Sequence, residues 1–386
     1  MALKYSLVQK AKIVAGAGSI SFIADVVKDA GYKRPFLVFD KGIKEFGIAD
    51  KVISVLDEAG IAHAEYDQVV PEPPNTMVDR GADLCKEKEC DCVIAIGGGA
   101  VIDTAKGITA LGFNPGKIMD YAEGKEMAQA HGLIVIPTTS GTGSELSDGM
   151  VISDSETGKK VPILGDKCMS EYVVLDPELP AGMPPALTAM TGLDVFSHAM
   201  ESYTTIFAGM ATAPISEKIM EDVVTYLPRA VADGGDMEAR ERMHMASCLG
   251  GWMLANANTH VGHSMAHVIG AAFHIPHGAA CAYAAPSVIR FLAPGIPDKV
   301  KKVGEILGAE FIGDESSQEI GDKVAKAYEN FRDSLGLRDI SEYGISKDEA
   351  VKLEPKVAAE VFAPLTPVEV TEEDAARLLE ETFGGR

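Results

Sequence analysis

The sequence predicts two domains, an N-terminal doubly wound α/β domain followed by an all-α C-terminal domain. The chain has 386 residues, more than the roughly 250–300 residues at which a single hydrophobic core stops growing. Short β-rich runs alternate with helical patterns in its first half, and helical patterns rich in alanine and methionine dominate its second half. We expect the domains to span residues 1–182 and 183–386.

Four apolar runs predict a parallel sheet in the first half. They are FLVFD at 36–40, CVIAIGGG at 92–99, LIVIPTT at 133–139 and YVVLDP at 172–177. Strands of a parallel sheet are buried on both faces, so they read as nearly continuous apolar runs. Segments 50–59 and 78–87 have apolar residues at helical spacing, and we expect them to cover the sheet.

The segment DPELPAGMPP, at residues 176–185, predicts the domain boundary. Its four prolines disfavour continuation of a strand or a helix. After it, helical patterns continue almost to the C-terminus, with breaks near 233–236, 275–278 and 313–315.

The composition excludes several function classes. A net charge of −22 opposes binding to nucleic acid or to an anionic membrane surface. No apolar run has transmembrane length, and lysines interrupt the N-terminal apolar stretches, unlike in a secretory signal. The six cysteines lack zinc-ribbon spacing, and we interpret them as free thiols. We therefore expect a cytoplasmic protein.

Two loops that follow predicted strands suggest a dinucleotide site. Gly97, Gly98 and Gly99 connect a buried strand to a helix, where glycines let backbone N–H groups approach a phosphate. Segment 138–145 is rich in hydroxyls and glycines, which can bind phosphate or ribose without adding charge. An ordinary tight turn and a solvated helix cap are the structural alternatives.

Asp40 closes the strand FLVFD. An acidic residue at this place can accept hydrogen bonds from a ribose and repel a 2′-phosphate, which favours NAD over NADP. A strand-end turn aspartate is the alternative.

The histidines cluster in the second half. Five of the nine lie within 18 residues: His260, His263, His267, His274 and His277. Asp194 and His198 are four residues apart, so on a helix they share one face. Taken singly, each has a structural alternative; Asp194, for example, fits the third position of a capping box begun by Thr191. Together they predict a metal site.

The motifs GGGAVIDTAKG, PTTSGTGSE, DPELPAGMPP, TGLDVFSHAMESY and THVGHSMAHVIGAAFHIPHG resemble, in this order, those of the iron-containing alcohol dehydrogenase family, including its lactaldehyde reductases and propanediol dehydrogenases. The resemblance implies the architecture shared with dehydroquinate synthase, an N-terminal dinucleotide-binding domain, a helical metal-binding and catalytic domain, and an active site in the cleft between them. Fe(II) is the implied metal, and Zn(II) suits the same donors.

The resemblance also implies roles for individual residues. The implied metal ligands are Asp194, His198, His263 and His277, and His267 matches a histidine near the substrate that is not a ligand. The implied dinucleotide contacts are Asp40, Gly97, Gly98, Gly99, Thr138, Thr139, Thr142 and Lys160.

Three positions depart from the family pattern. Ala100 replaces a common Ser after the glycine loop, Cys281 stands where Asn is frequent, and Glu72–Pro73 replaces an Asn–Pro pair. We expect neither of the last two changes to touch a metal ligand, so that they bear on substrate preference rather than on chemistry.

We hypothesise that the protein is a metal-dependent, NAD-dependent oxidoreductase that transfers hydride between the nicotinamide and a small primary alcohol, diol or aldehyde. The metal would act as a Lewis acid, and His267 or His274 would relay the hydroxyl proton. We also expect a homodimer or larger homo-oligomer.

Two alternatives remain. One is a metal- and NAD-dependent lyase or cyclase of the dehydroquinate synthase type; such an enzyme needs basic residues beside the metal, and none lies within the metal motifs. The other is a non-catalytic oligomer subunit whose histidines hold a structural metal.

Overall fold

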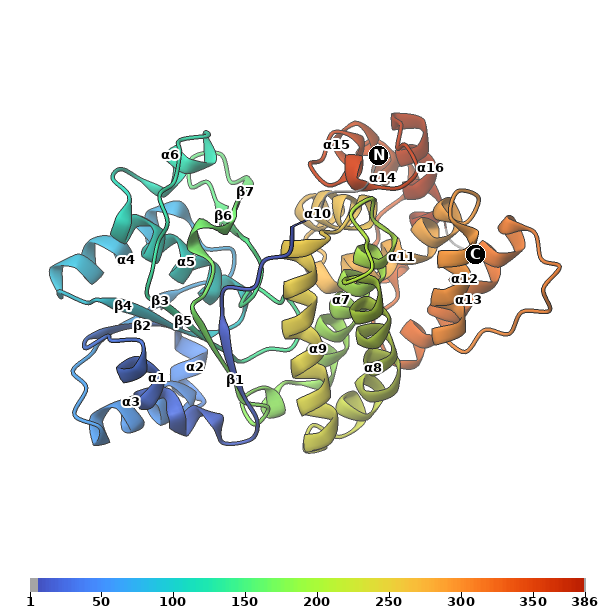
Figure 1. The fold of residues 1–386 in the computed structure, drawn as a ribbon. Helices are drawn as coiled ribbons and strands as arrows, with labels where there is room; N and C mark the ends of the chain where they lie inside the picture. The colour runs from blue at the N-terminus through green and yellow to red at the C-terminus, as the bar shows by residue number, and fades with distance from the viewer. Residues whose placement is uncertain (1–5, 385–386) are drawn as a thin grey trace. The chain divides into compact units, whose positions relative to one another are not determined.

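The computed structural model describes residues 6–384 and divides into two compact units. One unit spans Val8–Gly182, and the other comprises the chain from Met183 onward together with residues 6–7 (Figure 1). The division therefore falls inside the proline-rich segment that ends the last strand pattern.

A parallel six-stranded sheet forms the centre of the first unit. Its strand order is β1-β8-β5-β4-β2-β3. The strands of this sheet are β1 (Lys12–Ala15), β2 (Pro35–Asp40), β3 (Ala64–Val69), β4 (Cys92–Gly97), β5 (Leu133–Pro137) and β8 (Tyr172–Leu175). A separate antiparallel hairpin consists of β6 (Gly149–Ser153) and β7 (Lys160–Leu164).

Helices cover both faces of this sheet, as alternation along β2 shows. Leu37 and Phe39 belong to one core, whereas Phe36 and Val38 belong to the core on the opposite face. The first core is completed by α1 (Ile23–Asp29) and α3 (Ile48–Glu58), and the second by α4 (Asn75–Glu87), α5 (Gly99–Phe113) and α6 (Ile118–Ala122). The short helix α2 (Lys41–Glu45) follows β2. The doubly wound prediction is confirmed.

Strand register brings the two predicted cofactor loops together. Gly97 pairs with Pro137 across β4 and β5, and the backbone N–H of Thr138 donates to the carbonyl of Gly97 at 3.1 Å. β2 runs parallel to β4 on its other side, so Asp40, the last residue of β2, lies at the same edge of the sheet. Ligands of open α/β sheets bind at this carboxyl edge.

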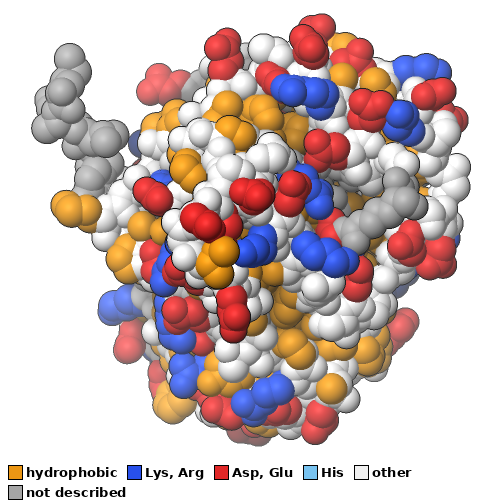
Figure 2. Space-filling model, turned by 90° about the vertical axis from the view of Figure 1, so that its right-hand side faces the viewer, with side chains coloured by type: hydrophobic (Ala, Val, Ile, Leu, Met, Phe, Trp, Pro, Cys, Tyr) orange, Lys and Arg blue, Asp and Glu red, His pale blue; other side chains and the backbone are white. Residues whose placement is uncertain are grey.

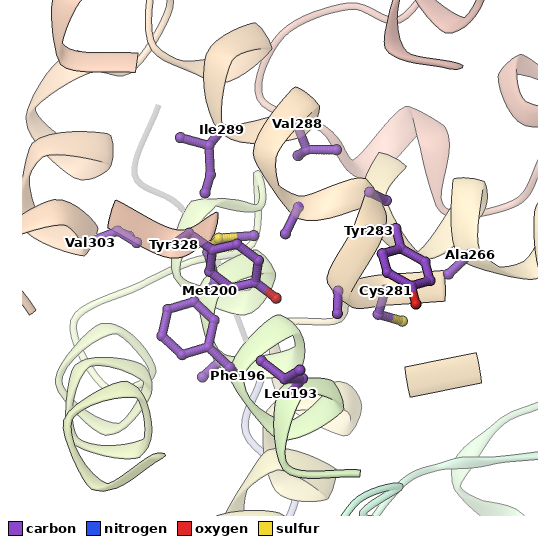
Figure 3. Close-up of a cluster of buried hydrophobic side chains, with 14 of the residues drawn as sticks. Leu193, Phe196, Met200, Ala266, Cys281, Tyr283, Val288, Ile289, Val303 and Tyr328 are labelled. Atoms are coloured by element: carbon purple, nitrogen blue, oxygen red, sulfur yellow. The ribbon is translucent and has the colours of Figure 1, made fainter. Parts of the chain in front are cut away.

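The second unit is helical. Its helices are α7 (Pro185–Thr204), α8 (Ala213–Ala232), α9 (Met237–Asn256), α10 (Val261–Phe273), α11 (His277–Leu292), α12 (Pro297–Ile306), α13 (Ser317–Ser334), α14 (Lys347–Val351), α15 (Glu354–Ala358) and α16 (Glu372–Phe383). Short 3₁₀ turns lie between some of them, including Ala363–Leu365. Figure 3 shows part of the core, in which Phe196 packs beside Tyr328.

Charged side chains of both signs are mixed on the surface. On the face shown in Figure 2, Lys and Arg side chains are interspersed with Asp and Glu rather than gathered in one patch. Between residues 6 and 384, no helix combines the length and apolar character that crossing a bilayer requires.

Candidate metal centre and cofactor loops

Four side chains of the second unit converge on one point. Oδ1 of Asp194 lies 3.6 Å from Nε2 of His198, 3.8 Å from Nε2 of His263 and 3.6 Å from Nε2 of His277. One candidate ligand atom from each of the four residues lies within 4.8 Å of the others. With metal–N and metal–O distances of about 2.0–2.2 Å, two donors of one metal lie at most about 4.4 Å apart. The three distances from Asp194 satisfy this limit.

Local helix geometry explains the convergence. Asp194 and His198 are four residues apart on α7 and therefore share a face. Because α7 already begins at Pro185, Thr191 lies inside the helix, and the capping-box interpretation of Asp194 is wrong. Pro276 precedes the first residue of α11, which places His277 at the start of that helix.

The site has the polar character of a metal centre. Oδ1 of Asp194 is buried without a hydrogen-bond partner among the described residues, which is costly unless a cation satisfies it. Burial lowers the pKa of His198 to about 4 and that of His263 to about 3. Both imidazoles are therefore neutral at pH 7 and present a lone pair, so this donor set fits a divalent metal.

Glu201 supports the centre and was missed by the sequence analysis. This carboxylate, 1% exposed, accepts the backbone N–H groups of His260 and His263 through Oε2 at 2.8 and 3.2 Å. Its Oε1 lies 2.6 Å from Nδ1 of His263. The Nδ1–H of His263 therefore donates to Glu201, and Nε2 remains for the metal. Glu201 lies seven residues after Asp194 on α7, a spacing that places both side chains on one face of the helix and could have revealed Glu201 from the sequence.

His267 lies beside the four donors. Its ring stacks on that of His277 with centroids 5.3 Å apart, and its Nδ1 lies 2.9 Å from Oε1 of Glu360. Ser264 Oγ and the backbone N–H of Phe362 donate to Oε2 of Glu360, each at 2.8 Å. Glu360, which the sequence analysis also missed, thus fixes one nitrogen of His267 and leaves Nε2 available.

The remaining histidines of the cluster have other positions. His260 is fully buried, and its Nε2 lies 2.8 Å from the hydroxyl of Thr204. His274 is exposed and ends α10 in the left-handed region at φ 55°. In the part of the chain that the structure describes, its ring makes none of the ring contacts that join His263, His267 and His277.

Cys281 contradicts one expectation. We expected this departure from the family pattern not to touch a metal ligand. Its Sγ lies 3.7 Å from Nε2 of His277 and 3.9 Å from Nε2 of His263. The physical reason is the helix period, because Cys281 lies four residues after His277 on α11 and shares its face.

The predicted cofactor residues of the first unit form two facing loops. A Cβ on Gly98 would lie 3.1 Å from Oγ1 of Thr139, and a Cβ on Gly99 would lie 3.0 Å from Cγ2 of Thr142. A Cβ on Gly97 would meet Val101 at 2.6 Å. Gly98 and Gly99 therefore let the two loops pack closely, since a Cβ at either position would make a tight contact, and the glycines expose backbone N–H groups at the start of α5.

A buried lysine positions the hydroxyl-rich loop. Nζ of Lys106, on α5, donates to the backbone oxygen and Oγ of Ser147 at 2.9 and 3.0 Å and to the carbonyl of Gly149 at 2.6 Å. The sequence analysis gave Lys106 no role. Lys106 lies on the same helix as Gly99 and is surrounded by apolar residues in the sequence. This pattern is the signal that indicates a buried structural cation.

Asp40 and Lys160, the other two predicted cofactor residues, lie outside the two facing loops. Asp40 caps α2, since its Oδ1 accepts the backbone N–H of Ile43 at 3.0 Å. Lys160, at the start of β7, is exposed and forms an ion pair of 2.8 Å with Glu72. The departure at Glu72 therefore supplies the partner of Lys160.

The fold and the site define a class of two-unit, metal-dependent enzymes. The family description "Iron-containing alcohol dehydrogenase" matches residues 10–177, and "Fe-containing alcohol dehydrogenase family, C-terminal" matches residues 188–383. The chain belongs to the iron-containing alcohol dehydrogenase family and is an oxidoreductase of that family.

Individual relatives cover most of the chain. The NADPH-dependent butanol dehydrogenase of Clostridium saccharobutylicum is 34% identical over 87% of this chain and 86% of its own length. The NAD-dependent methanol dehydrogenase of Bacillus methanolicus is 30% identical over 96% and 97%. The crystal structure of a 1,3-propanediol oxidoreductase has a TM-score of 0.93 at 30% identity, covering 99% of this chain and 100% of its own. These similarities favour neither the lyase nor the non-catalytic alternative.

Proposed function

We propose that the protein transfers hydride between NAD(H) and a small primary alcohol or diol, or the corresponding aldehyde. The convergence of Asp194, His198, His263 and His277 is the observation that carries the proposal. Relatives described as acting on methanol, butanol and 1,3-propanediol support the substrate class. We propose Fe(II) as the metal, with Zn(II) as the alternative that the same donors accept.

The residues present divide the work of the reaction. When bound, the metal supplies Lewis-acid polarisation of the substrate oxygen, and the nicotinamide supplies or accepts hydride. Asp194 contributes the one carboxylate among the four donors, and Glu201 fixes the tautomer of His263. The buried surroundings exclude water from three of the four donors and strengthen every electrostatic interaction there.

We assign proton exchange with the substrate hydroxyl to His267. The hydrogen bond of its Nδ1 with Glu360 leaves Nε2 to exchange the proton, and the 35% exposed side chain gives that proton a route to solvent. His274 is the second candidate for the relay, and it is the weaker one because none of the ring contacts among the described histidines joins it to His263, His267 or His277. His267→Asn should lower kcat without loss of metal, whereas His274→Asn should leave both unchanged. The reverse pattern would reassign the relay to His274.

We assign dinucleotide binding to the glycine loop at Gly97, Gly98 and Gly99 and to the loop carrying Thr138, Thr139 and Thr142, which the glycine contacts place face to face. Asp40 at the same sheet edge would select NAD by repelling a 2′-phosphate. Asp40→Asn preserves a helix-capping side chain, so increased use of NADP by this variant would support the assignment, and unchanged preference would refute it. Lys160 is the outermost proposed contact, on the hairpin.

We further propose a cytoplasmic homo-oligomer. None of the six cysteines, all of which lie among the described residues, is in a disulfide, which agrees with a reducing compartment. Sedimentation equilibrium of the purified protein tests the oligomer, and a single species of monomer mass would exclude it.

The decisive experiment follows absorbance of reduced nicotinamide with anaerobically iron-loaded protein, NAD and a panel of short alcohols and diols, then NADH and the aldehydes. We expect turnover that depends on metal and cofactor and that is abolished in Asp194→Ala. Tight binding of NAD and metal with no redox on any substrate would return the lyase to consideration.

A further inference from the structure

Two cysteines meet where α4 ends. Cys85 lies in the last turn of the helix, Lys88 is its C-cap, and Glu89 has the left-handed conformation at φ 53°. The backbone N–H of Cys90 donates to the carbonyl of Cys85 at 3.1 Å. The backbone N–H of Glu89 donates to the carbonyl of Lys86 at 3.0 Å. These two hydrogen bonds define a Schellman motif, which brings the side chains of its first and last residues together across the helix end.

The side chains that this motif joins are both thiols. The thiol of Cys85 donates a hydrogen bond to the sulfur of Cys90. Both residues are partly exposed, whereas the other four cysteines of the chain are buried. Residues that face each other across a helix end are within the reach of a disulfide, whose Cα atoms lie about 4.4–6.8 Å apart. The pair therefore combines contact between two sulfurs with access for small solutes.

The surroundings make Cys90 the more reactive thiol of the two. The hydrogen bond from Cys85 and the nearby guanidinium of Arg34 lower the pKa of Cys90 despite its partial burial. The same hydrogen bond and burial raise the pKa of Cys85. Nε of Arg34 is buried without a hydrogen-bond partner among the described residues, so a thiolate at Cys90 places a negative charge beside a poorly solvated cation. The carboxylate of Asp91 opposes this effect, but it accepts the backbone N–H groups of Lys33 and Arg34 at 2.8 and 2.9 Å. Cys90 is thus the thiol that ionises first.

We propose that Cys85 and Cys90 form a site of reversible thiol oxidation, at which a low-molecular-weight disulfide such as oxidised glutathione closes an intrachain Cys85–Cys90 disulfide. The thiolate of Cys90 attacks one sulfur of the glutathione disulfide, a mixed disulfide forms, and one glutathione thiolate leaves. Cys85 then loses its proton to solvent, attacks the sulfur of Cys90 and expels the second glutathione. Two protein thiols are oxidised, and one glutathione disulfide is reduced to two thiols.

The pair lies away from the proposed cofactor loops, so the inference does not depend on the proposed function. Cys90 precedes β4, which begins at Cys92 and ends at Gly97. Because the strands of the sheet are parallel, their amino ends lie at the edge opposite the loops that follow Gly97 and Pro137. The disulfide therefore joins the end of α4 to the chain that enters β4. Reduced and oxidised protein should bind NADH with equal affinity in a titration of nicotinamide fluorescence, and weaker binding after oxidation would overturn this part of the proposal.

Mass spectrometry of the full chain tests the linkage. The folded protein is incubated with oxidised glutathione near neutral pH, free thiols are alkylated, and the product is digested with trypsin. Lys86 and Lys88 lie between the two cysteines, so trypsin separates them and leaves a disulfide as a link between peptide 81–86 and the peptide that begins at Glu89. We expect these joined peptides from the unaltered protein and from Cys92→Ser, which removes the other cysteine of the second peptide, and we expect dithiothreitol to separate them. Failure to obtain the joined peptides would overturn the proposal.

Single variants separate the two steps of the reaction. Cys85→Ser should stop at the mixed disulfide and carry one glutathionyl group on Cys90, whereas Cys90→Ser should keep Cys85 reduced over the same period. Arg34→Gln should slow the first step about threefold or more, because it removes the cation that favours the thiolate. Arg80→Gln, which changes an exposed arginine of α4, should react like the unaltered protein. Glutathionylation of Cys85 in Cys90→Ser at the rate of the unaltered protein would overturn the assignment of Cys90 as the attacking thiol.

Discussion

Oε1 of Glu201 lies 2.6 Å from Nδ1 of His263, on the side of the ring opposite the nitrogen that faces Asp194. The same carboxylate receives two backbone N–H groups at the start of α10, so its position is fixed by three hydrogen bonds. Glu201 therefore selects the tautomer of His263 in which Nε2 carries the lone pair. A carboxylate behind a metal-binding histidine also makes that histidine a stronger donor.

Glu201→Gln should weaken metal binding about 10–100-fold, because the amide is a poorer acceptor for Nδ1–H and can present its own N–H groups to the ring. The measurement is competition with a chromophoric chelator at pH 7. Glu145→Gln, which changes a buried glutamate of the other unit, is the control and should bind metal normally. Equal affinities in the two variants would mean that Glu201 has only a structural role.

Gly262 is required by the position of Glu201. A Cβ on Gly262 would lie 2.6 Å from Oε1 of Glu201, whereas a Cβ on Gly250 would find its nearest neighbour, Cβ of His198, at 3.7 Å. We expect Gly262→Ala to lower the free energy of unfolding by about 1–3 kcal/mol and to weaken metal binding. Gly250→Ala, on α9, should be neutral or stabilise by up to about 1 kcal/mol. Urea unfolding and metal titration of both variants check this, and equal tolerance of the two would contradict the tight contact.

The sequence predicts the central strands of the first unit but misses its edges. β2, β4, β5 and β8 are almost continuously buried, so they appear as apolar runs. The edge strands β1 and β3 are partly exposed, and β3 reads AEYDQV, which has no apolar run. The hairpin β6–β7 also escapes prediction, because its strands GMVIS and KVPIL are short and partly exposed, do not alternate between apolar and polar residues, and include Pro162 in the second strand.

Some residues of the candidate site could be predicted from the sequence, whereas others are brought together only by packing. Helical spacing pairs Asp194 with His198, but only packing of α10 and α11 against α7 brings His263 and His277 to them. Glu360 could not be found by spacing, because it lies 93 residues from His267. Cys281 is four residues from His277, and the helical period alone would have placed its sulfur near the His277 ring.

Glu145 should make the stability of the protein depend on pH. Burial raises the pKa of Glu145 from 4.5 to about 7, since its charged form is desolvated. An acid whose folded-state pKa is raised stabilises most below its unfolded pKa, and this stability is lost as pH rises through the folded value. Between pH 5 and pH 8, Glu145→Gln should therefore gain about 2–3 kcal/mol relative to the unaltered protein. Urea unfolding at both pH values measures this difference, and a gain that does not change with pH would contradict the burial argument.

Gly99 and Gly112 lie near opposite ends of α5. Substituting each of them distinguishes an effect on dinucleotide binding from an effect on helix stability. A Cβ on Gly99 would approach Cγ2 of Thr142 at 3.0 Å and Oγ1 at 3.2 Å, whereas a Cβ on Gly112 would meet nothing within 4 Å. If the two loops bind the pyrophosphate, Gly99→Ala separates them and should weaken NADH binding at least about tenfold, or about 1.4 kcal/mol. Gly112→Ala should leave binding unchanged and favour the helix by up to about 1 kcal/mol. Titration of nicotinamide fluorescence gives both affinities. Normal NADH binding by a folded Gly99→Ala variant would argue against a pyrophosphate held between the two loops, because Thr142 has to shift by a few tenths of an ångström to admit the new Cβ.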